Sequence, residues 1–196
     1  LAAPRRILVV TTTMPAKILP AVPRIARALA ELGAEGVEIV ATLTPEAGAR
    51  EMGVEPPSGA VVVPGPVPVR CIGPVPHERL GALYRAGSAV LVPSWVESFT
   101  AVYPEAWHFG LPVVTSDLDF ARDLCGAAAL YAPPERPEAF ALQLGRALAD
   151  EPVRRALDAA GREPPLDTRM REKAVPQFVD RRLRAGLHRV GPLSSP

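Results

Sequence analysis

Short apolar runs alternate along this 196-residue chain with stretches in which apolar residues recur every three or four positions. This alternation is typical of a parallel sheet covered by helices on both faces. The apolar runs predict strands at Arg6–Thr12, Gly36–Leu43, Ser88–Val92, Pro112–Ser116 and Ala127–Tyr131. The periodic stretches predict helices at Ala21–Leu32, His77–Arg85, Ala101–Phe109, Phe120–Leu124, Pro137–Leu148 and Glu151–Ala160. We therefore predict an α/β fold with a doubly wound parallel sheet of about six strands, a Rossmann-like arrangement.

Two parts of the chain fit this alternation less well. Residues 44–70 are rich in Pro and Gly, so we expect a variable crossover there, with weak strand candidates at Val61–Val63 and Val67–Cys71. Near the C-terminus, residues 170–187 carry an apolar stripe at helical spacing, which predicts a helix that needs a covering surface. We expect a binding domain over residues 1–164 and a C-terminal helix and tail over residues 165–196.

Composition narrows the classes of function. The 22 Lys and Arg residues nearly balance the 21 Asp and Glu residues, which leaves a net charge of +1 and no basic surplus for nucleic acid. No apolar run has the length of a membrane span, and the start of the chain lacks a signal-peptide pattern, so we expect a cytoplasmic domain. Cys71 and Cys125 match neither a metal nor a redox spacing and are expected to be buried, reduced thiols.

The loop after the first predicted strand offers candidate chemistry. In an open parallel sheet, ligands bind beyond the carboxyl ends of the strands, where loops lead into helices. Here three threonines, Thr11 to Thr13, precede Lys17, a cation that could meet a phosphate at a helix start. The alternative is a solvated lysine beside threonines that cap a helix.

A second candidate loop runs from Pro93 into the predicted helix Ala101–Phe109. Glu97 lies ahead of this helix and Glu105 in its second turn, while the free N–H groups of Phe99 to Val102 could seat a diphosphate. Carboxylates beside an anion site suit neutral hydroxyl ligands, such as those of a sugar. The alternative for both glutamates is a surface salt bridge.

The stretch from Cys71 to Leu157 resembles the donor-binding domain of glycosyltransferase family 4, the retaining enzymes of the GT-B fold. The segment PSWVESFTAVYPEAWHFGLPVV contains the pair of glutamates separated by seven residues that marks the family, here Glu97 and Glu105. Residues 6–43 resemble the first strand–helix–strand unit of the same domain, with Lys17 at the position of the phosphate-binding lysine. The resemblance implies that this chain is one half of a GT-B fold.

The resemblance also implies a role for each site residue. Glu97 would contact the donor sugar and, with Lys17, form the catalytic pair, while Glu105 would bind the ribose hydroxyls. The diphosphate would meet the backbone of Phe99, Thr100, Ala101 and Val102, and Thr12 and Ser98 would also belong to the donor-binding site. The loop containing Gly73 and Val75 would meet the base.

Several positions depart from the family pattern. Thr11-Thr12 stands where the family usually has Gly-Arg, so half of a cationic diphosphate clamp is missing. Ile18, Ser98 and Thr100 replace glycines that normally allow close approach of the backbone to the ligand. These changes predict a weaker or rearranged contact with the diphosphate.

The activity implied is transfer of a sugar from a nucleotide diphosphate sugar to an acceptor hydroxyl with retained anomeric configuration and without a metal or other cofactor. The expected partners are the sugar donor and an N-terminal acceptor-binding domain absent from this chain, and the full enzyme could associate peripherally with a membrane. Two alternatives stay open. One is a non-catalytic nucleotide- or partner-binding module derived from a GT-B enzyme, and the other is a different GT-B enzyme such as a sugar-nucleotide 2-epimerase.

Overall fold

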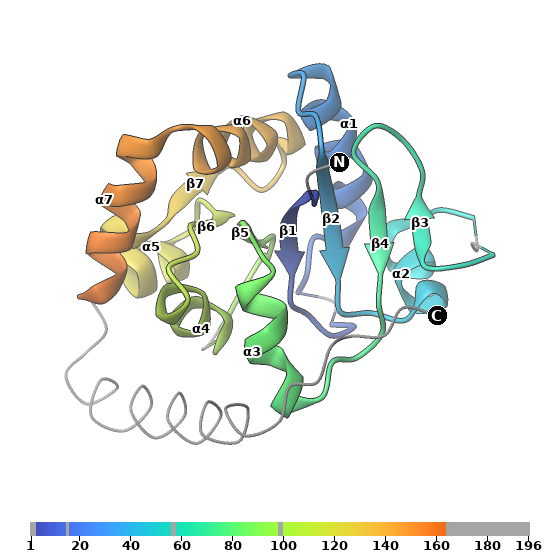
Figure 1. The fold of residues 1–196 in the computed structure, drawn as a ribbon, viewed down its shortest axis with the longest axis horizontal. Coiled ribbons are helices and arrows are strands. Elements are labelled where there is room, and N and C mark those ends of the chain that lie inside the picture. The colour runs from blue at the N-terminus through green and yellow to red at the C-terminus, as the bar shows by residue number, and fades with distance from the viewer. Residues whose placement is uncertain (1–2, 15, 56–57, 98–99, 164–196) are drawn as a thin grey trace.

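A computed structural model describes residues 3–14, 16–55, 58–97 and 100–163, and the description below is confined to them. The helix predicted over 170–187 and the tail domain 165–196 lie outside this range. The strands of the described part are β1 (Arg5–Val9), β2 (Val37–Ala41), β3 (Val61–Val63), β4 (Val69–Cys71), β5 (Ala89–Val92), β6 (Val113–Ser116) and β7 (Leu130–Ala132). They form one seven-stranded sheet in the order β3-β4-β2-β1-β5-β6-β7 (Figure 1).

Parallel pairing runs through the sheet except at one edge, where β3 pairs antiparallel with β4. The α-helices are α1 (Val22–Glu31), α2 (Pro45–Met52), α3 (His77–Arg85), α4 (Val102–His108), α5 (Asp119–Cys125), α6 (Pro137–Ala149) and α7 (Glu151–Arg162). Short 3-10 helices are η1 (Leu19–Ala21) and η2 (Gly126–Ala128). The predicted α/β class with a doubly wound sheet is confirmed.

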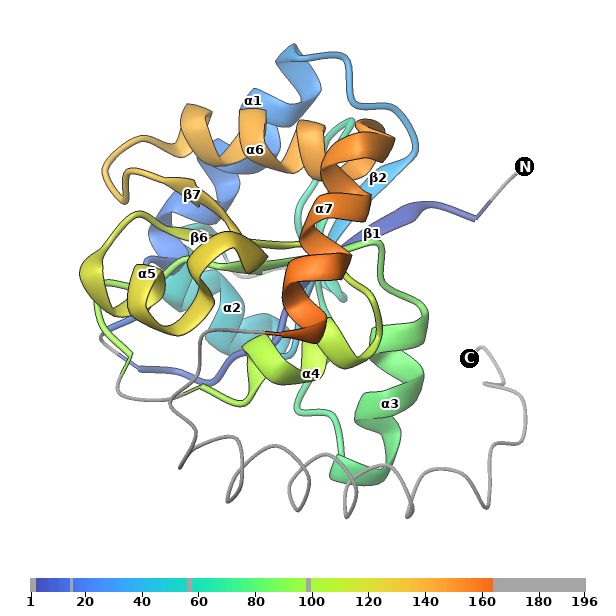
Figure 2. The same cartoon turned by 90° about the vertical axis from the view of Figure 1, so that its left-hand side faces the viewer.

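Helices cover both faces of the sheet, which explains why the strands are almost continuously apolar. On β1, Ile7 and Val9 belong to the apolar cluster that includes α1, α2 and α6, while Leu8 belongs to the cluster that includes α3 and α4. Figure 2 shows α1 and α6 together on one side of the sheet and α3 and α4 on the other. Helix α7 packs against α4, α6 and η2.

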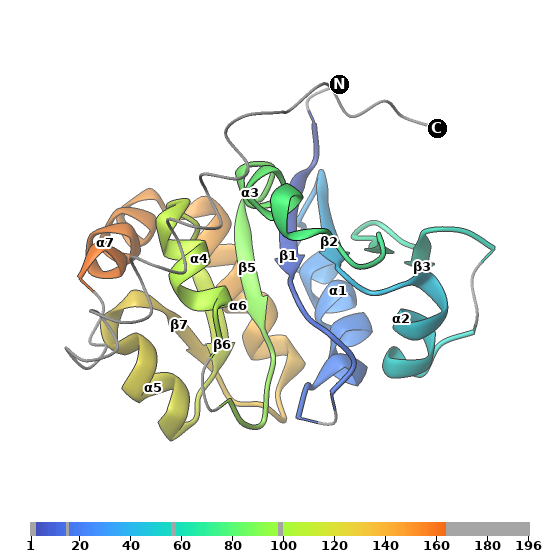
Figure 3. The ribbon, with the colours of Figure 1, turned by 90° about the horizontal axis from the view of Figure 1, so that it is seen from below.

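The order of the strands creates a switch point between β1 and β5. From β1 the chain winds outward through β2 to β4, whereas from β5 it winds the other way through β6 to β7 (Figure 3). The loops that leave the carboxyl ends of β1 and β5 therefore lead to helices on opposite faces of the sheet, and ligands bind at this place in such sheets. Both candidate loops of the sequence lie at this place.

Three predicted elements need correction. Residues 44–70 contain helix α2 as well as two strands, because the Thr44 hydroxyl caps the N–H of Ala47 at 3.2 Å and Gly53 ends the helix at φ +66°. Both weak strand candidates are strands, so the sheet has seven strands rather than about six. The strand predicted over Ala127–Tyr131 begins only at Leu130, because the 3-10 helix η2 occupies its first residues.

Candidate functional site

Two loops that lie far apart in the sequence are joined by backbone hydrogen bonds at the switch point. Lys17, after β1, and Ser94, after β5, form an isolated antiparallel bridge. On either side of it, the N–H of Ile18 donates to Pro93 O and the N–H of Trp95 donates to Ala16 O, both at 2.8 Å. The two loops therefore form one unit, and a side chain from one has a fixed position relative to the other.

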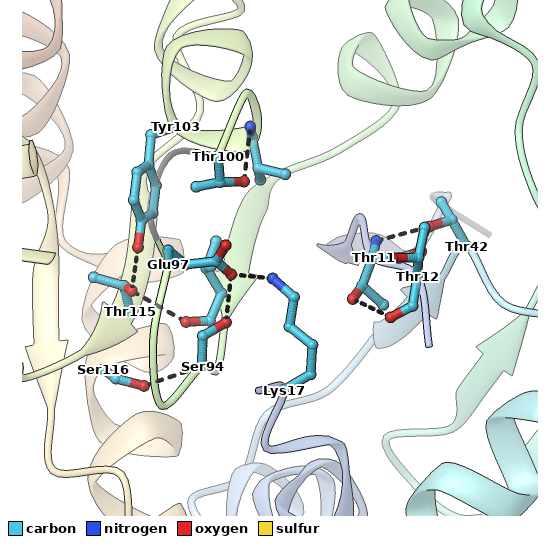
Figure 4. A network of polar contacts seen from close by, with 12 residues as sticks. Thr11, Thr12, Lys17, Thr42, Ser94, Glu97, Thr100, Tyr103, Thr115 and Ser116 are labelled. Carbon is cyan, nitrogen blue, oxygen red and sulfur yellow. Dashed lines mark hydrogen bonds and ion pairs between the residues drawn. The ribbon is translucent and has the colours of Figure 1, made fainter. Parts of the chain in front are cut away.

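Lys17 and Glu97 form an ion pair across this unit (Figure 4). Lys17 Nζ contacts Glu97 Oε1, and the two side chains are only 9% and 13% exposed. The Ser94 hydroxyl, on a fully buried residue, donates to the same Oε1 atom at 2.8 Å. Two donors thus hold one oxygen of the Glu97 carboxylate, in a place where few water molecules compete for it.

Buried hydroxyls on β6 and α4 support the end of β5 beneath this pair. The N–H of Ser94 donates to Ser116 Oγ at 3.1 Å, and the Thr115 hydroxyl donates to Val92 O at 3.1 Å. Tyr103 Oη lies 2.8 Å from Thr115 Oγ1, and burial raises the pKa of the Tyr103 hydroxyl, so this group stays protonated. The floor of the site is therefore a neutral network of hydroxyl groups.

The threonines before Lys17 lie apart from the ion pair in Figure 4. The Thr11 N–H donates to Thr42 Oγ1 at 2.8 Å, and the Thr42 hydroxyl donates back to Thr11 O at 2.9 Å, which ties the end of β1 to the end of β2. Thr12 is exposed and its carbonyl accepts from the Thr11 hydroxyl at 3.0 Å. Because residue 12 is a threonine and not the arginine usual in the family, it adds no positive charge here.

The start of α4 differs from the expectation. The helix begins at Val102, so Glu105 lies in its first turn rather than its second. The N–H of Val102 is not free, because it donates to the Thr100 hydroxyl at 3.3 Å. Ala101 precedes the helix as its half-buried N-cap. The predicted contacts at Ser98 and Phe99 lie outside the described residues.

Glu105 is held on the face of the sheet that α3 and α4 cover. It is 8% exposed, and its Oε2 atom accepts a hydrogen bond of 2.8 Å from the hydroxyl of Tyr84 on α3. The Tyr84 ring stacks on Phe109 with 5.4 Å between ring centroids. The alternative of a glutamate on the surface is therefore not the arrangement seen for Glu105, which is buried.

The loop between β4 and α3 leaves the same edge of the sheet. Gly73 has φ +80°, a left-handed conformation that favours glycine, and its N–H donates to Leu43 O beyond the end of β2 at 2.7 Å. Val75 follows, half-buried. The structure thus places Gly73 and Val75 at the carboxyl edge of the sheet, and their contact with a base stays a prediction.

Comparison with known proteins now identifies the family. The sequence profile described as "Glycosyl transferases group 1" matches residues 66–164, about half of the chain. The chain belongs to this family. The resemblance to the GT-B glycosyltransferases is thereby confirmed, and the two proposed donor-binding glutamates both lie within the matched segment.

Curated relatives of this group 1 domain align over less than half of the chain. An O-antigen chain mannosyltransferase B of Escherichia coli is 33% identical over 93 residues, which are 47% of this chain and 24% of that protein. A D-inositol 3-phosphate glycosyltransferase of Corynebacterium jeikeium is 39% identical over 92 residues, which are 45% of this chain and 22% of that protein. The chain therefore matches only about a quarter of the length of these relatives.

Among solved structures, an α,α-trehalose-phosphate synthase (UDP-forming) from Burkholderia vietnamiensis has the same fold. The TM-score is 0.65 at 18% sequence identity, and the match covers 93% of this chain and 46% of that protein. The likeness in fold therefore extends over nearly the whole chain but over less than half of the synthase.

Two further properties concern the described residues only. Their helices are all too short or too polar to cross a membrane. Within them, no three side chains of His, Cys, Asp or Glu are grouped so that they could hold a metal ion.

Two residues of the site escaped the sequence reasoning. Ser94 is a hydroxyl residue two positions after the predicted strand Ser88–Val92 and three positions before Glu97. Tyr84 gave no such signal, because its partner Glu105 is 21 positions away on another helix and only the tertiary fold brings the two together.

Proposed function

We propose that this group 1 domain binds the donor of a retaining glycosyltransferase, which moves a sugar from a nucleotide diphosphate sugar to an acceptor hydroxyl. The observation that carries the proposal is the Lys17–Glu97 pair at the switch point of the sheet. It places a cation and a carboxylate side by side, and these are the groups that a diphosphate and a sugar hydroxyl require.

We propose that Lys17 contacts both the diphosphate and Glu97. An ammonium group has three N–H donors, so Lys17 can contact a phosphate oxygen while it keeps its contact with Glu97. In that position the cation would stabilise the negative charge that develops on the leaving diphosphate. Glu97, held through Oε1, would accept a hydrogen bond from a sugar hydroxyl.

The remaining contacts are proposed as the family resemblance implies them. We assign Glu105 to the ribose, the loop of Gly73 and Val75 to the base, and Thr12 with the backbone of residues 98–102 to the diphosphate. Thr100 would have to release the N–H of Val102 before that group could meet a phosphate. No metal or other cofactor takes part in this proposal.

We assign none of the described residues to the acceptor. We propose that an N-terminal domain binds it, and that the whole enzyme works in the cytoplasm, with peripheral association with a membrane where the acceptor is a lipid. The proposal includes no nucleic acid partner, since the chain has a net charge of only +1.

Two observations favour a second function, a nucleotide-binding module without transfer activity. Thr12 replaces the family's usual arginine, and the Val102 N–H already has a partner in Thr100. Both features reduce the positive potential that a leaving diphosphate needs, but neither removes a group that binds the nucleoside. A sugar-nucleotide 2-epimerase gains no comparable support.

The proposal is tested by titrating the chain with a series of ligands that grows by one group at a time: nucleoside, monophosphate, diphosphate and diphosphate sugar. Calorimetry with the uridine, guanosine and adenosine series also identifies the base. We expect affinity to rise at the diphosphate step, because Lys17 then contacts a phosphate. We expect it to rise again at the sugar step, because Glu97 then accepts a hydrogen bond from a sugar hydroxyl. Equal affinity for monophosphate and diphosphate in every series would contradict the proposal.

A further inference from the structure

Each proposed donor-binding glutamate accepts a hydrogen bond from a buried hydroxyl group, Glu97 from a serine of its own loop and Glu105 from a tyrosine of another helix. Ser94 Oγ lies 2.8 Å from Glu97 Oε1, and Tyr84 Oη lies 2.8 Å from Glu105 Oε2. The serine is 0% exposed and the tyrosine 1% exposed, so neither hydroxyl is placed to meet a ligand itself. A role for these hydroxyls must therefore act through the carboxylates.

The surroundings of Ser94 make it a rigid support. Its N–H is fixed by Ser116 Oγ at 3.1 Å, and its backbone pairs with that of Lys17. Because Ser94 and Lys17 both donate to Oε1, the carboxylate of Glu97 has little freedom to rotate. In the described part of the chain, Glu97 Oε2 makes no hydrogen bond, and in Figure 4 the other carboxylate oxygen points away from Lys17 and Ser94. The fixed oxygen thus sets the direction of the other.

Tyr84 is held equally firmly, by a different kind of contact. Its ring lies nearly parallel to that of Phe109, with an interplanar angle of 7°. Tyr84 belongs to α3 and Glu105 to α4, so the hydrogen bond between them spans two helices on one face of the sheet. A tyrosine hydroxyl has a single proton to donate, and here it is directed at Oε2.

We propose that Ser94 and Tyr84 are positioning residues, one for each glutamate: Ser94 orients Glu97 toward the donor sugar and Tyr84 orients Glu105 toward the ribose. The inference rests on the proposed function. Its physical basis is preorganisation, since a carboxylate held in its binding direction loses less freedom when the ligand arrives.

The experiment measures two ratios of affinity on the 196-residue chain by calorimetry. The sugar ratio compares UDP-glucose, GDP-mannose and ADP-glucose with UDP, GDP and ADP. The ribose ratio compares those three diphosphates with their 2′-deoxy forms. We expect both ratios to exceed one in the unsubstituted chain, for the base that binds.

The two substitutions should separate the ratios. Ser94→Ala should lower the sugar ratio by about threefold to tenfold, the effect of one lost hydrogen bond, and leave the ribose ratio unchanged. Tyr84→Phe should lower the ribose ratio by about the same factor and leave the sugar ratio unchanged. A residue with a purely structural role would lower the melting temperature without moving one ratio alone.

Tyr131→Phe is the matched control. It also removes a tyrosine hydroxyl that donates a hydrogen bond within the chain, but the acceptor is the carbonyl oxygen of Gly126, which is not part of the candidate site. This variant should keep both ratios. If Ser94→Ala does not fold, Ser94→Cys replaces it, since a thiol is a weaker hydrogen-bond donor than a hydroxyl. If Tyr84→Phe does not fold, Tyr84→His replaces it, since the ring N–H of histidine does not reach as far as the tyrosine hydroxyl.

The outcomes separate a failure of the proposed function from a failure of the roles assigned to Ser94 and Tyr84. Ratios of one in the unsubstituted chain would overturn the proposed function and this inference with it. Ratios above one that survive both substitutions, or that fall together in all three variants, would overturn the inference alone.

Discussion

At the scale of single residues, the charge of Lys17 is balanced by Glu97 before any ligand is bound. We expect Lys17→Ala to weaken the binding of a nucleoside diphosphate by about 1–3 kcal/mol, because a charged hydrogen bond to phosphate is lost. Nucleoside affinity should change little. Calorimetry of both ligands provides the measurement, with Arg24→Ala as the control, since Arg24 forms an exposed ion pair with Glu138 on the surface. Equal weakening of both ligands would show that Lys17 does not contact phosphate.

The two cysteines give a prediction about reactivity. Burial raises the pKa of Cys71 from 9.0 to about 11 and also raises the pKa of Cys125, so both thiols stay protonated at pH 8 in the folded chain. The thiolate is the reactive form, and we expect neither cysteine to react with a disulfide reagent before the chain unfolds. Absorbance after addition of dithionitrobenzoate, with and without denaturant, measures this. Reaction of either thiol in the folded chain at the rate of a free thiol would contradict it.

Sequence reasoning at this scale identified charges better than it identified their partners. Lys17 and Glu97 were both singled out, and the structure brings them together because their loops follow neighbouring parallel strands. The hydrogen bonds of Thr100 and Glu105 could not be predicted from the sequence. The first depends on where α4 begins, and the second depends on how α3 packs beside α4. The roles assigned to these residues stay predictions.

At the scale of elements, the contact between α7 and α4 depends on a glycine. A Cβ atom on Gly161 would lie 2.8 Å from the ring of Trp107, and that ring is fixed by the hydrogen bond from its Nε1 to Ala128 O at 3.0 Å. Gly161→Ala should therefore destabilise the chain by about 1–3 kcal/mol. This cost exceeds the gain in helix propensity, which is at most about 1 kcal/mol.

Gly145 on α6 is the matched control, because a Cβ atom there would meet nothing within 4 Å. Gly145→Ala should stabilise the chain by about 0.5–1 kcal/mol. Urea unfolding of both variants measures the difference. If Gly161→Ala were as stabilising as Gly145→Ala, the packing described for α7 and α4 would be wrong.

Elements with a clear period were predictable, and elements defined by their ends were not. The predicted helix His77–Arg85 has the bounds of α3, since its apolar spacing is regular and Pro76 precedes it. Helix α2 was missed because Pro and Gly in residues 44–70 suggested an irregular crossover. Its Pro45 and Gly53 are in fact the start and end signals of a short helix. The Pro and Gly content of the segment suggested a loop, whereas the positions of Pro45 and Gly53 mark the two ends of a helix.

At the scale of the whole molecule, the chain corresponds to 46% of the trehalose-phosphate synthase whose fold it shares. We expect the 196-residue chain to bind a sugar donor but not to transfer the sugar, because we propose that a separate domain binds the acceptor. Release of nucleoside diphosphate from the donor, with and without simple sugar acceptors, measures transfer. Turnover by this chain at about 1 per second or faster, a rate usual for enzymes, would contradict the half-enzyme proposal.

The central claim is that Glu97 binds the sugar while Lys17 binds the diphosphate, and one measurement tests it most directly. Calorimetry of Glu97→Gln should show an affinity for the bare nucleoside diphosphate no weaker than that of the unsubstituted chain, because the substitution leaves Lys17 in place without its counter-charge. Affinity for the diphosphate sugar should fall by about 1–3 kcal/mol, because a charged acceptor becomes a neutral amide. Glu138→Gln, at an exposed position on α6, should change neither affinity. If Glu97→Gln instead weakens the bare diphosphate as much as the sugar donor, Glu97 does not bind the sugar and the account of this site is wrong.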